Sequence, residues 1–173
     1  MKDNKINKVV ADLIGSHLPP NYTVFVGLGN IDRADDGAGL LISRALKKDF
    51  PHIAFSEEEK SVESFVFDFI ENPDIKKIVF IDAADLGADP GDVEVYSYTD
   101  IKKFVPSFST HKVPIAFIFE WIKKSGKEPY LIGIQPKTLE FMGQISESCK
   151  KTVSLLTEVI SLRLKNSINN EYL

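Results

Sequence analysis

The sequence has little of several features that mark common classes of protein. It holds a single cysteine, Cys149, so no internal disulfide can form and a reducing, cytoplasmic environment is expected. No apolar run approaches the roughly twenty residues that a membrane helix needs, and the polar first residues lead into no signal-peptide core. We therefore expect no membrane insertion. The sequence also has no excess of basic residues: it contains 21 basic and 25 acidic ones, which argues against a nucleic-acid partner.

What the sequence does contain is typical of one soluble α/β domain. A chain of 173 residues is long enough to bury a sizeable core. Segments with helical spacing alternate with short apolar runs, which predicts a three-layer αβα sandwich around a mainly parallel sheet of about five strands. We interpret residues 1–21 as an N-terminal helical extension and 166–173 as a frayed tail. A monomer is expected, because the sequence has no long apolar edge and no coiled-coil pattern.

Periodicity predicts where the helices and strands lie. The predicted strands are 23–28, 53–56, 77–83, 92–98 and 130–135. The predicted helices are 5–17, 38–48, 62–70, 112–124 and a last one that Ser146 caps and that ends near 164. Strand 92–98 alternates polar and apolar residues, so we expect an edge strand, antiparallel to 77–83. Helix 112–124 is apolar almost all round and should be largely buried, with Ser109 or Thr110 as its cap and Pro114 in its first turn.

Three candidate chemical groups stand at strand ends or at a helix start. Asp36 follows the first strand, Asp82 ends the buried run, and His111 begins the apolar helix. In an open α/β sheet the strand ends and the loops after them meet at one edge, where ligands bind. Two carboxylates and an imidazole can hold a divalent transition metal and leave positions open for a substrate. Structural roles as turn caps or helix-start residues remain alternatives for all three.

The segment Gly27-Leu28-Gly29 also has the opening of a dinucleotide-binding fingerprint. The third glycine of that pattern would fall at Asp32, whose side chain would hinder close helix packing. The neighbouring carboxylates would repel a pyrophosphate. A nucleotide-binding α/β domain is therefore the weaker alternative.

Other polar groups make smaller contributions to the predicted site. Asp85 follows Asp82 in the same loop, and Gln135 at a strand end could bind a peptide through its amide or hold its own loop. The run Glu57-Glu58-Glu59 is interpreted as a solvated helix entry. No serine sits in a nucleophile elbow, and no His-Glu-x-x-His pair occurs, so serine hydrolases and ordinary zinc peptidases are disfavoured.

Four short motifs follow one another along the chain. They are Gly27–Asn30 with Asp35–Gly39, Ile81–Gly87 with Pro90-Gly91, Ser109–Pro114, and Gly133–Pro136 with Leu139–Phe141. Together, in register from about residue 23 to 160, they resemble the nickel–iron hydrogenase maturation endopeptidases, nearest to the hydrogenase 3-type branch. The resemblance implies a hydrolase of aspartic or metal-dependent type. Its substrate would be a [NiFe]-hydrogenase large-subunit precursor, from which it removes the C-terminal extension after nickel insertion.

The resemblance also implies roles for particular residues. Asp36, Asp82 and His111 match the positions that contact the metal in the family, so we expect them to be the metal-binding and catalytic residues. By the same resemblance, the metal would be nickel supplied by the precursor, although other divalent ions could occupy such a site in vitro. Asp35 and Asp85 are further catalytic candidates, and the candidates for substrate binding are Gly29, Asn30 and Gln135.

One loop departs from the family pattern. Many members carry Asp-Gly-Gly-Ser or Asp-Gly-Gly-Thr after the second strand, where this chain reads Ser56-Glu57-Glu58-Glu59-Lys60-Ser61. Without the glycines this loop cannot adopt the same positive-φ turns at low cost. The departure leaves open an alternative function, a metal-sensing module that binds the hydrogenase precursor without cleaving it.

Overall fold

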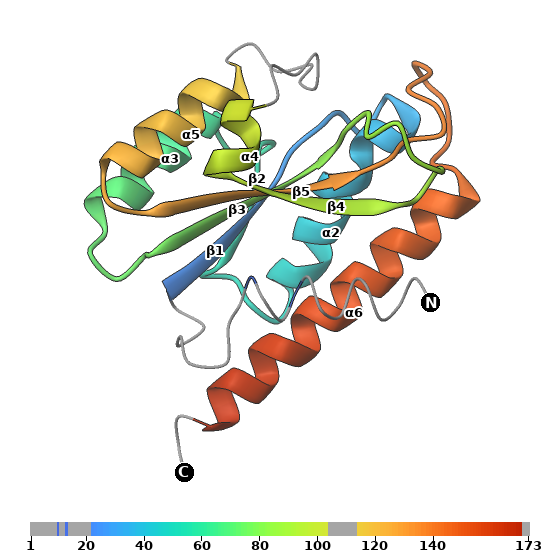
Figure 1. The fold of residues 1–173 in the computed structure, drawn as a ribbon. Helices are drawn as coiled ribbons and strands as arrows, with labels where there is room; N and C mark the ends of the chain where they lie inside the picture. The colour runs from blue at the N-terminus through green and yellow to red at the C-terminus, as the bar shows by residue number, and fades with distance from the viewer. Residues whose placement is uncertain (1–9, 11–12, 14–21, 104–113, 171–173) are drawn as a thin grey trace.

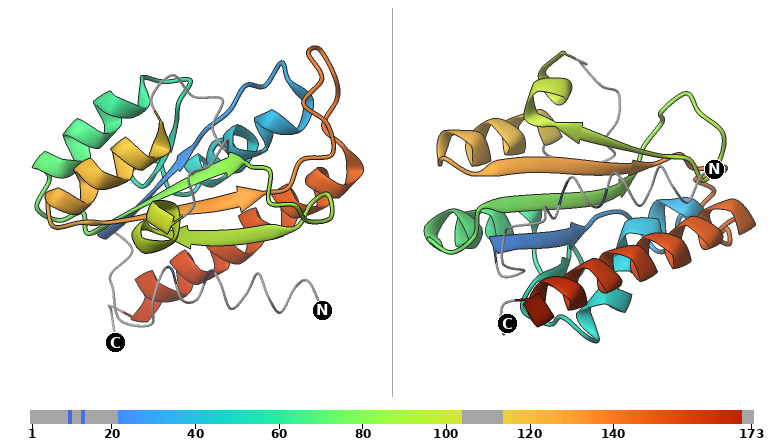
Figure 2. Two further views of the ribbon diagram at one scale, coloured as in Figure 1. Left: turned by 45° about the horizontal axis from the view of Figure 1, so that its top comes forward. Right: turned by 60° about the horizontal axis from the view of Figure 1, so that its bottom comes forward.

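The computed structural model describes residues 10, 13, 22–103 and 114–170, and its centre is a sheet with helices on both faces (Figures 1 and 2). The described strands follow the order β2-β1-β3-β5-β4. Their bounds are β1 Thr23–Gly27, β2 Ala54–Ser56, β3 Lys77–Ala83, β4 Val93–Ser97 and β5 Glu128–Ile134. All neighbouring pairs are parallel except β4 with β5. The α/β fold expected from the sequence, with one antiparallel edge strand, is thereby confirmed.

The edge strand has a different partner from the one predicted. β4 pairs with β5, with Val95 opposite Ile132, and not with β3. Both edges of β3 are already occupied, because β1 pairs with one and β5 with the other. β3 is buried along almost its whole length and so belongs at the centre of the sheet, whereas β4 is half-exposed and suits an edge.

Two helical layers cover the sheet. On one face α2 (Ala38–Lys47) and α6 (Glu147–Asn170) pack together, and on the other α3 (Val62–Glu71) packs with α5 (Ile115–Lys124). Alternate residues of β3 serve the two layers: Val79 and Ile81 join the core under α2 and α6, while Ile78 and Phe80 join the core under α3 and α5. A short helix that the sequence did not predict, α4 (Tyr98–Lys103), follows β4.

Helix α5 is less buried than its composition predicted. Ile118, Phe119 and Ile122 pack into the core, but Phe117 is 71% exposed and Trp121 40% exposed. A helix on the outer layer of a sandwich has only one face toward the sheet, so the aromatic residues on the other face stay in solvent. Pro114 is the N-cap residue of α5 and not part of its first turn. The predicted caps and the predicted first residues of this helix, 109–113, lie outside the described residues.

The ends of the chain differ in part from expectation. Most of the predicted helix 5–17 lies outside the described residues, but Val10 and Leu13 are helical and buried in the core. Helix α6 continues to Asn170, beyond the predicted end near residue 164, and the last residues of the predicted frayed tail, 171–173, lie outside the described residues. Ser146 caps α6 as predicted, because its Oγ accepts the N–H of Cys149 at 3.4 Å. Among the described residues, none of the helices combines the length and hydropathy that crossing a bilayer requires.

A buried carboxylate ties the first strand's loop to the loop before α6. Asp35 lies in the short 3-10 helix η2 (Ala34–Gly37) and is 0% exposed. It accepts the N–H groups of Lys137 at 2.8 Å, Thr138 at 3.2 Å and Ser146 at 2.6 Å, and the Ser146 hydroxyl at 2.9 Å. Burial acts to raise the pKa of Asp35, but these hydrogen bonds outweigh it and hold the pKa below its ordinary value.

Replacing Asp35→Asn should destabilise the protein by about 3 kcal/mol at pH 7, because an amide cannot accept all of these donors. The folded-state pKa is lowered, so the carboxylate's contribution is complete above the unfolded value of 3.8 and disappears as pH falls through the folded value. Urea unfolding at pH 7 and pH 3 should therefore show the gap between wild type and variant shrinking in acid.

The matched control is Asp68→Asn, which removes an exposed carboxylate paired with Lys60. It should change stability by less than about 1 kcal/mol at either pH. An Asp35→Asn variant as stable as this control would contradict the role assigned to Asp35.

Candidate functional site

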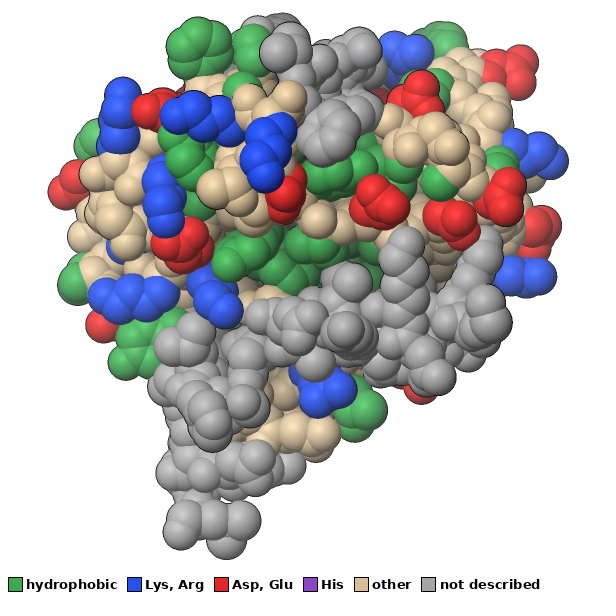
Figure 3. All heavy atoms as spheres, in the orientation of Figure 1, with side chains coloured by type: hydrophobic (Ala, Val, Ile, Leu, Met, Phe, Trp, Pro, Cys, Tyr) green, Lys and Arg blue, Asp and Glu red, His purple; other side chains and the backbone are tan. Residues whose placement is uncertain are grey.

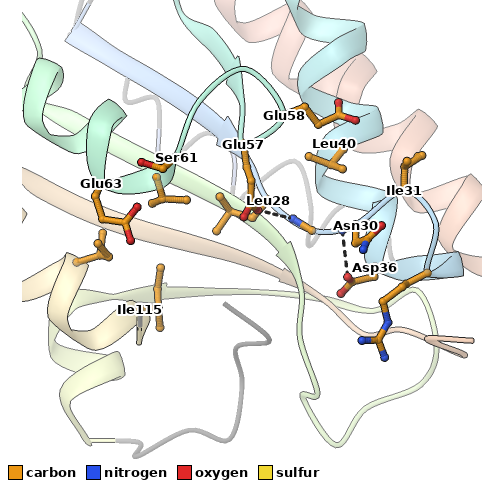
Figure 4. A pocket seen from close by; sticks show the side chains of 14 residues that line it. Leu28, Asn30, Ile31, Asp36, Leu40, Glu57, Glu58, Ser61, Glu63 and Ile115 are labelled. Atoms are coloured by element: carbon orange, nitrogen blue, oxygen red, sulfur yellow. Dashed lines mark hydrogen bonds between the residues drawn. The ribbon is translucent and has the colours of Figure 1, made fainter. Parts of the chain in front are cut away.

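A cavity of about 490 Å³ opens at the carboxyl ends of β1 and β2 (Figure 4). Leu28 and Gly29 follow β1, and Glu57 and Glu58 follow β2. Apolar side chains of α3 and α5 close the opposite wall. The described residues that line it include four acids, Asp36, Glu57, Glu58 and Glu63. The cavity lies outside the carboxyl ends of the parallel strands, where open α/β sheets bind their ligands.

Gly29 permits the tight turn that forms one wall. Its φ is +121°, a conformation that other residues rarely adopt. A Cβ atom at this position would lie 1.8 Å from the carbonyl oxygen of Asp36, so a side chain here would push the two segments apart. The N–H of Gly29 donates to Glu57 Oε2 at 3.0 Å, which joins the turn to the loop after β2.

Asp36 lies directly beside Gly29 in this wall. It is 3% exposed, and its Oδ2 accepts the N–H of Asn30 at 3.0 Å, a hydrogen bond drawn in Figure 4. The side chain of Asn30 is used locally, because its Oδ1 accepts the N–H of Asp32 at 2.9 Å. The chain from Gly29 to Asp36 therefore folds back on itself, with the Asp36 carboxylate held at the cavity.

Asp82 stands at the carboxyl end of β3, the strand next to β1. It is 5% exposed. By strand alternation it falls on the same side as Ile78 and Phe80, which is also the side on which Leu28 lines the cavity. The two strand ends are joined by the N–H of Leu28, which donates to the carbonyl of Ile81 at 2.9 Å. Asp82 itself does not line the cavity.

His111 lies outside the described residues, so its place relative to Asp36 and Asp82 stays a prediction. Within the described part of the chain, no group of three His, Cys, Asp or Glu side chains is arranged to hold a metal ion. Ile115, four residues after His111 in the sequence, lines the cavity.

Gln135 and Asp85 hold the loop after β3. Gln135 Oε1 accepts the N–H groups of Leu86 at 2.6 Å and Ala88 at 3.3 Å, and its Nε2 donates to Asp85 Oδ1 at 3.4 Å. Asp85 Oδ1 also accepts the N–H of Gly87 at 3.2 Å. These contacts fit the structural alternative for Gln135, and the substrate and catalytic roles of the two residues stay predictions. Asp35, whose carboxylate already accepts four hydrogen bonds, stays a catalytic candidate on the sequence resemblance alone.

The run of three glutamates is the predicted solvated helix entry only in part. Glu58 and Glu59 are exposed and pair with Arg44 and Lys47, which attaches this loop to α2. Glu57 is half-buried and lines the cavity. The hydrogen bond from Arg44 lowers the pKa of Glu58. Sequence reasoning missed Glu57 because its acidic neighbours suggested a solvent-exposed run. Its position directly after β2 was the available signal.

Acidic side chains outnumber basic ones in the lining of the cavity, which holds Arg33 besides the four acids named above. A lining of this sign attracts divalent cations and repels phosphates. On the face shown in Figure 3, Lys and Arg are more frequent on the left and Asp and Glu on the right, although both signs occur on each side.

Comparisons with known proteins show the family of the chain. A family model described as HycI, hydrogenase maturation protease, matches residues 61–162. A "Putative hydrogenase maturation protease" of Methanocaldococcus jannaschii is 31% identical over 150 residues, which cover 79% of this chain and 87% of that protein. The hydrogenase 3 maturation protease of Escherichia coli is 24% identical over 133 residues, covering 75% of this chain and 83% of that one.

A solved structure extends the likeness to nearly the whole fold. The crystal structure of the [NiFe] hydrogenase maturation protease HycI from Thermococcus kodakarensis superposes with a TM-score of 0.75 and 26% identity, covering 91% of this chain and 99% of that one. The family model spans more than half of the sequence, and the M. jannaschii relative covers more than two thirds of it. The chain therefore belongs to the HycI family of hydrogenase maturation proteases, which are peptidases.

Proposed function

We propose that this protein is an endopeptidase that removes the C-terminal extension of a [NiFe]-hydrogenase large-subunit precursor after nickel has been inserted. The observation that carries the proposal is the acidic cavity at the strand ends. Asp36 lines it, and Asp82 lies at the neighbouring strand end on the same side of the sheet. Membership of the family supports the peptidase activity.

The donor set fits the nickel of the precursor. Two carboxylates, Asp36 and Asp82, together with the imidazole of His111 would supply oxygen and nitrogen ligands, which a divalent transition metal accepts. Buried carboxylates are stabilised by a nearby positive charge, and the cavity presents acids where a nickel-bearing substrate would bring one. Nickel on the substrate would act as a Lewis acid or activate a water molecule for hydrolysis.

The shape of the cavity fits a short stretch of peptide. Its volume lies within the range of roughly 300–1,000 Å³ that is common for ligand sites. One wall is apolar, from Val62, Ile115 and Ile118, and the other is acidic. The walls of the cavity would bind and orient the segment that follows the nickel site of the precursor. Asp36 and Asp82 would hold the end of that segment that carries the nickel.

The nucleotide-binding alternative is disfavoured by the same contacts. In dinucleotide-binding loops the backbone N–H groups of the glycine turn bind phosphate oxygens. Here the N–H of Gly29 donates its hydrogen bond to Glu57, and acidic side chains line the space that a phosphate would occupy.

Replacing His111→Ala should reduce cleavage of a nickel-loaded precursor more than about 100-fold, because a ligand of the nickel is lost. Thermal unfolding should be nearly unchanged. Cleavage is followed by mass spectrometry of the precursor.

The matched control is His52→Ala, which removes an exposed histidine from the turn before β2 and should process the precursor at the wild-type rate. Normal processing by the His111→Ala variant would sink the proposed site.

Nickel in the precursor should decide whether cleavage takes place. The wild-type protein should shorten a nickel-loaded precursor and leave the nickel-free precursor intact, because the carboxylates recognise the metal and not the polypeptide alone. The measurement is the intact mass of the precursor after mixing. Equal cleavage of both forms would contradict recognition through nickel. Binding without any change of mass would instead favour the non-catalytic, metal-sensing module.

A further inference from the structure

The loop between β5 and α6 presents two large apolar side chains to solvent. Phe141 is 69% exposed and Met142 74% exposed, and Ile31, in the loop after β1, is 39% exposed. We propose that Phe141, Met142 and Ile31, here called the apolar tip, form a docking surface for the folded body of the large-subunit precursor. This inference rests on the proposed function, in which the neighbouring cavity takes the C-terminal segment of the same precursor.

The apolar tip is held firmly in place. The N–H of Met142 donates to the carbonyl of Asp32 at 2.6 Å, and Arg33 donates from Nε to the carbonyl of Leu139 at 3.4 Å. Met142 adopts a φ of +60°, which is unfavourable for a residue with a side chain. Asp35 fixes both ends of the same loop through Lys137 and Ser146. The fold thus orders a segment whose side chains point into water, which suits a preorganised binding surface.

The apolar tip is continuous with the cavity. Ile31 and Arg33 line the cavity, and Arg33 also contacts the loop that carries Phe141. Figures 1 and 2 show this loop, drawn in orange, beside the loop after β1 in each view. A partner seated on the apolar tip would therefore have its own chain within reach of the cavity.

The chemistry of the apolar tip favours a folded protein surface as its occupant. Phenylalanine and methionine are enriched at the centre of protein interfaces. Next to them Lys137 and Glu140 are exposed and of opposite charge, so the surface is not the basic cluster that an anionic membrane attracts. Among the described residues, the other exposed large apolar side chains are Phe67 on α3, Phe117 and Trp121 on α5, and Leu162 on α6, and none of them lines the cavity.

The test is a double variant, Phe141→Ser with Met142→Ser, in the full chain. Its Kd for the nickel-loaded large-subunit precursor, measured by calorimetry, should rise about tenfold or more because an apolar anchor is lost. The KM for cleavage should rise by a similar factor, with kcat within about twofold of wild type, because the cavity is untouched. The control Leu162→Ser changes an exposed leucine on α6 and should alter neither constant.

The outcomes separate this inference from the proposed function. An unchanged Kd, or a loss confined to kcat, would overturn the docking surface while leaving the peptidase in place. Wild-type protein that binds but never cleaves would refute the proposed function, and the Kd of the double variant would still decide the docking surface. No binding by wild type would refute both. Dimerisation of wild type that the double variant abolishes, seen by light scattering, would identify a second copy as the occupant and also overturn the inference.

Discussion

The hydrogen bonds accepted by the buried carboxylate of Asp35 are the interaction on which the candidate site depends. They join η2, at the end of the first strand's loop, to the loop that leads into α6. Asp36 follows Asp35 directly, so the hydrogen bonds that fix the loop also fix the position of Asp36, a candidate ligand of the nickel. On the other side it fixes the segment that carries Phe141 and Met142. One residue with a structural role thus determines the geometry of two surfaces that bind substrate in our proposals.

The loop after β2 gives this chain its own version of the cavity wall. Where glycines are common in the family that the sequence resembles, Glu57 reaches across to the N–H of Gly29, and Glu58 and Glu59 pair with α2. Hydrogen bonds and ion pairs therefore shape a loop that lacks glycine's freedom of φ. The result is an acidic wall beside Asp36, which suits a substrate that brings a divalent cation.

Local signals in the sequence were enough for most of the fold and for part of the site. The apolar run of β3 and the stripe of α3 predicted their elements closely. The strand-end rule identified Asp82, at the end of β3, and Asp36, which lies in η2 after the neighbouring strand β1. The pairing of β4 with β5 could not be read locally, because it depends on which strand fills the other edge of β3. The burial of Glu57 and the exposure of Phe117 likewise depend on neighbours that are distant in the sequence.

The central claim is that Asp36, Asp82 and His111 converge on the nickel of the precursor. X-ray absorption at the nickel edge tests it most directly, on the nickel-loaded precursor alone and in a complex frozen before cleavage. The account predicts added oxygen and nitrogen neighbours at the nickel in the complex with wild-type protein. These neighbours should be missing when the protein carries Asp36→Asn and Asp82→Asn. A nickel spectrum that binding leaves unchanged would contradict the claim.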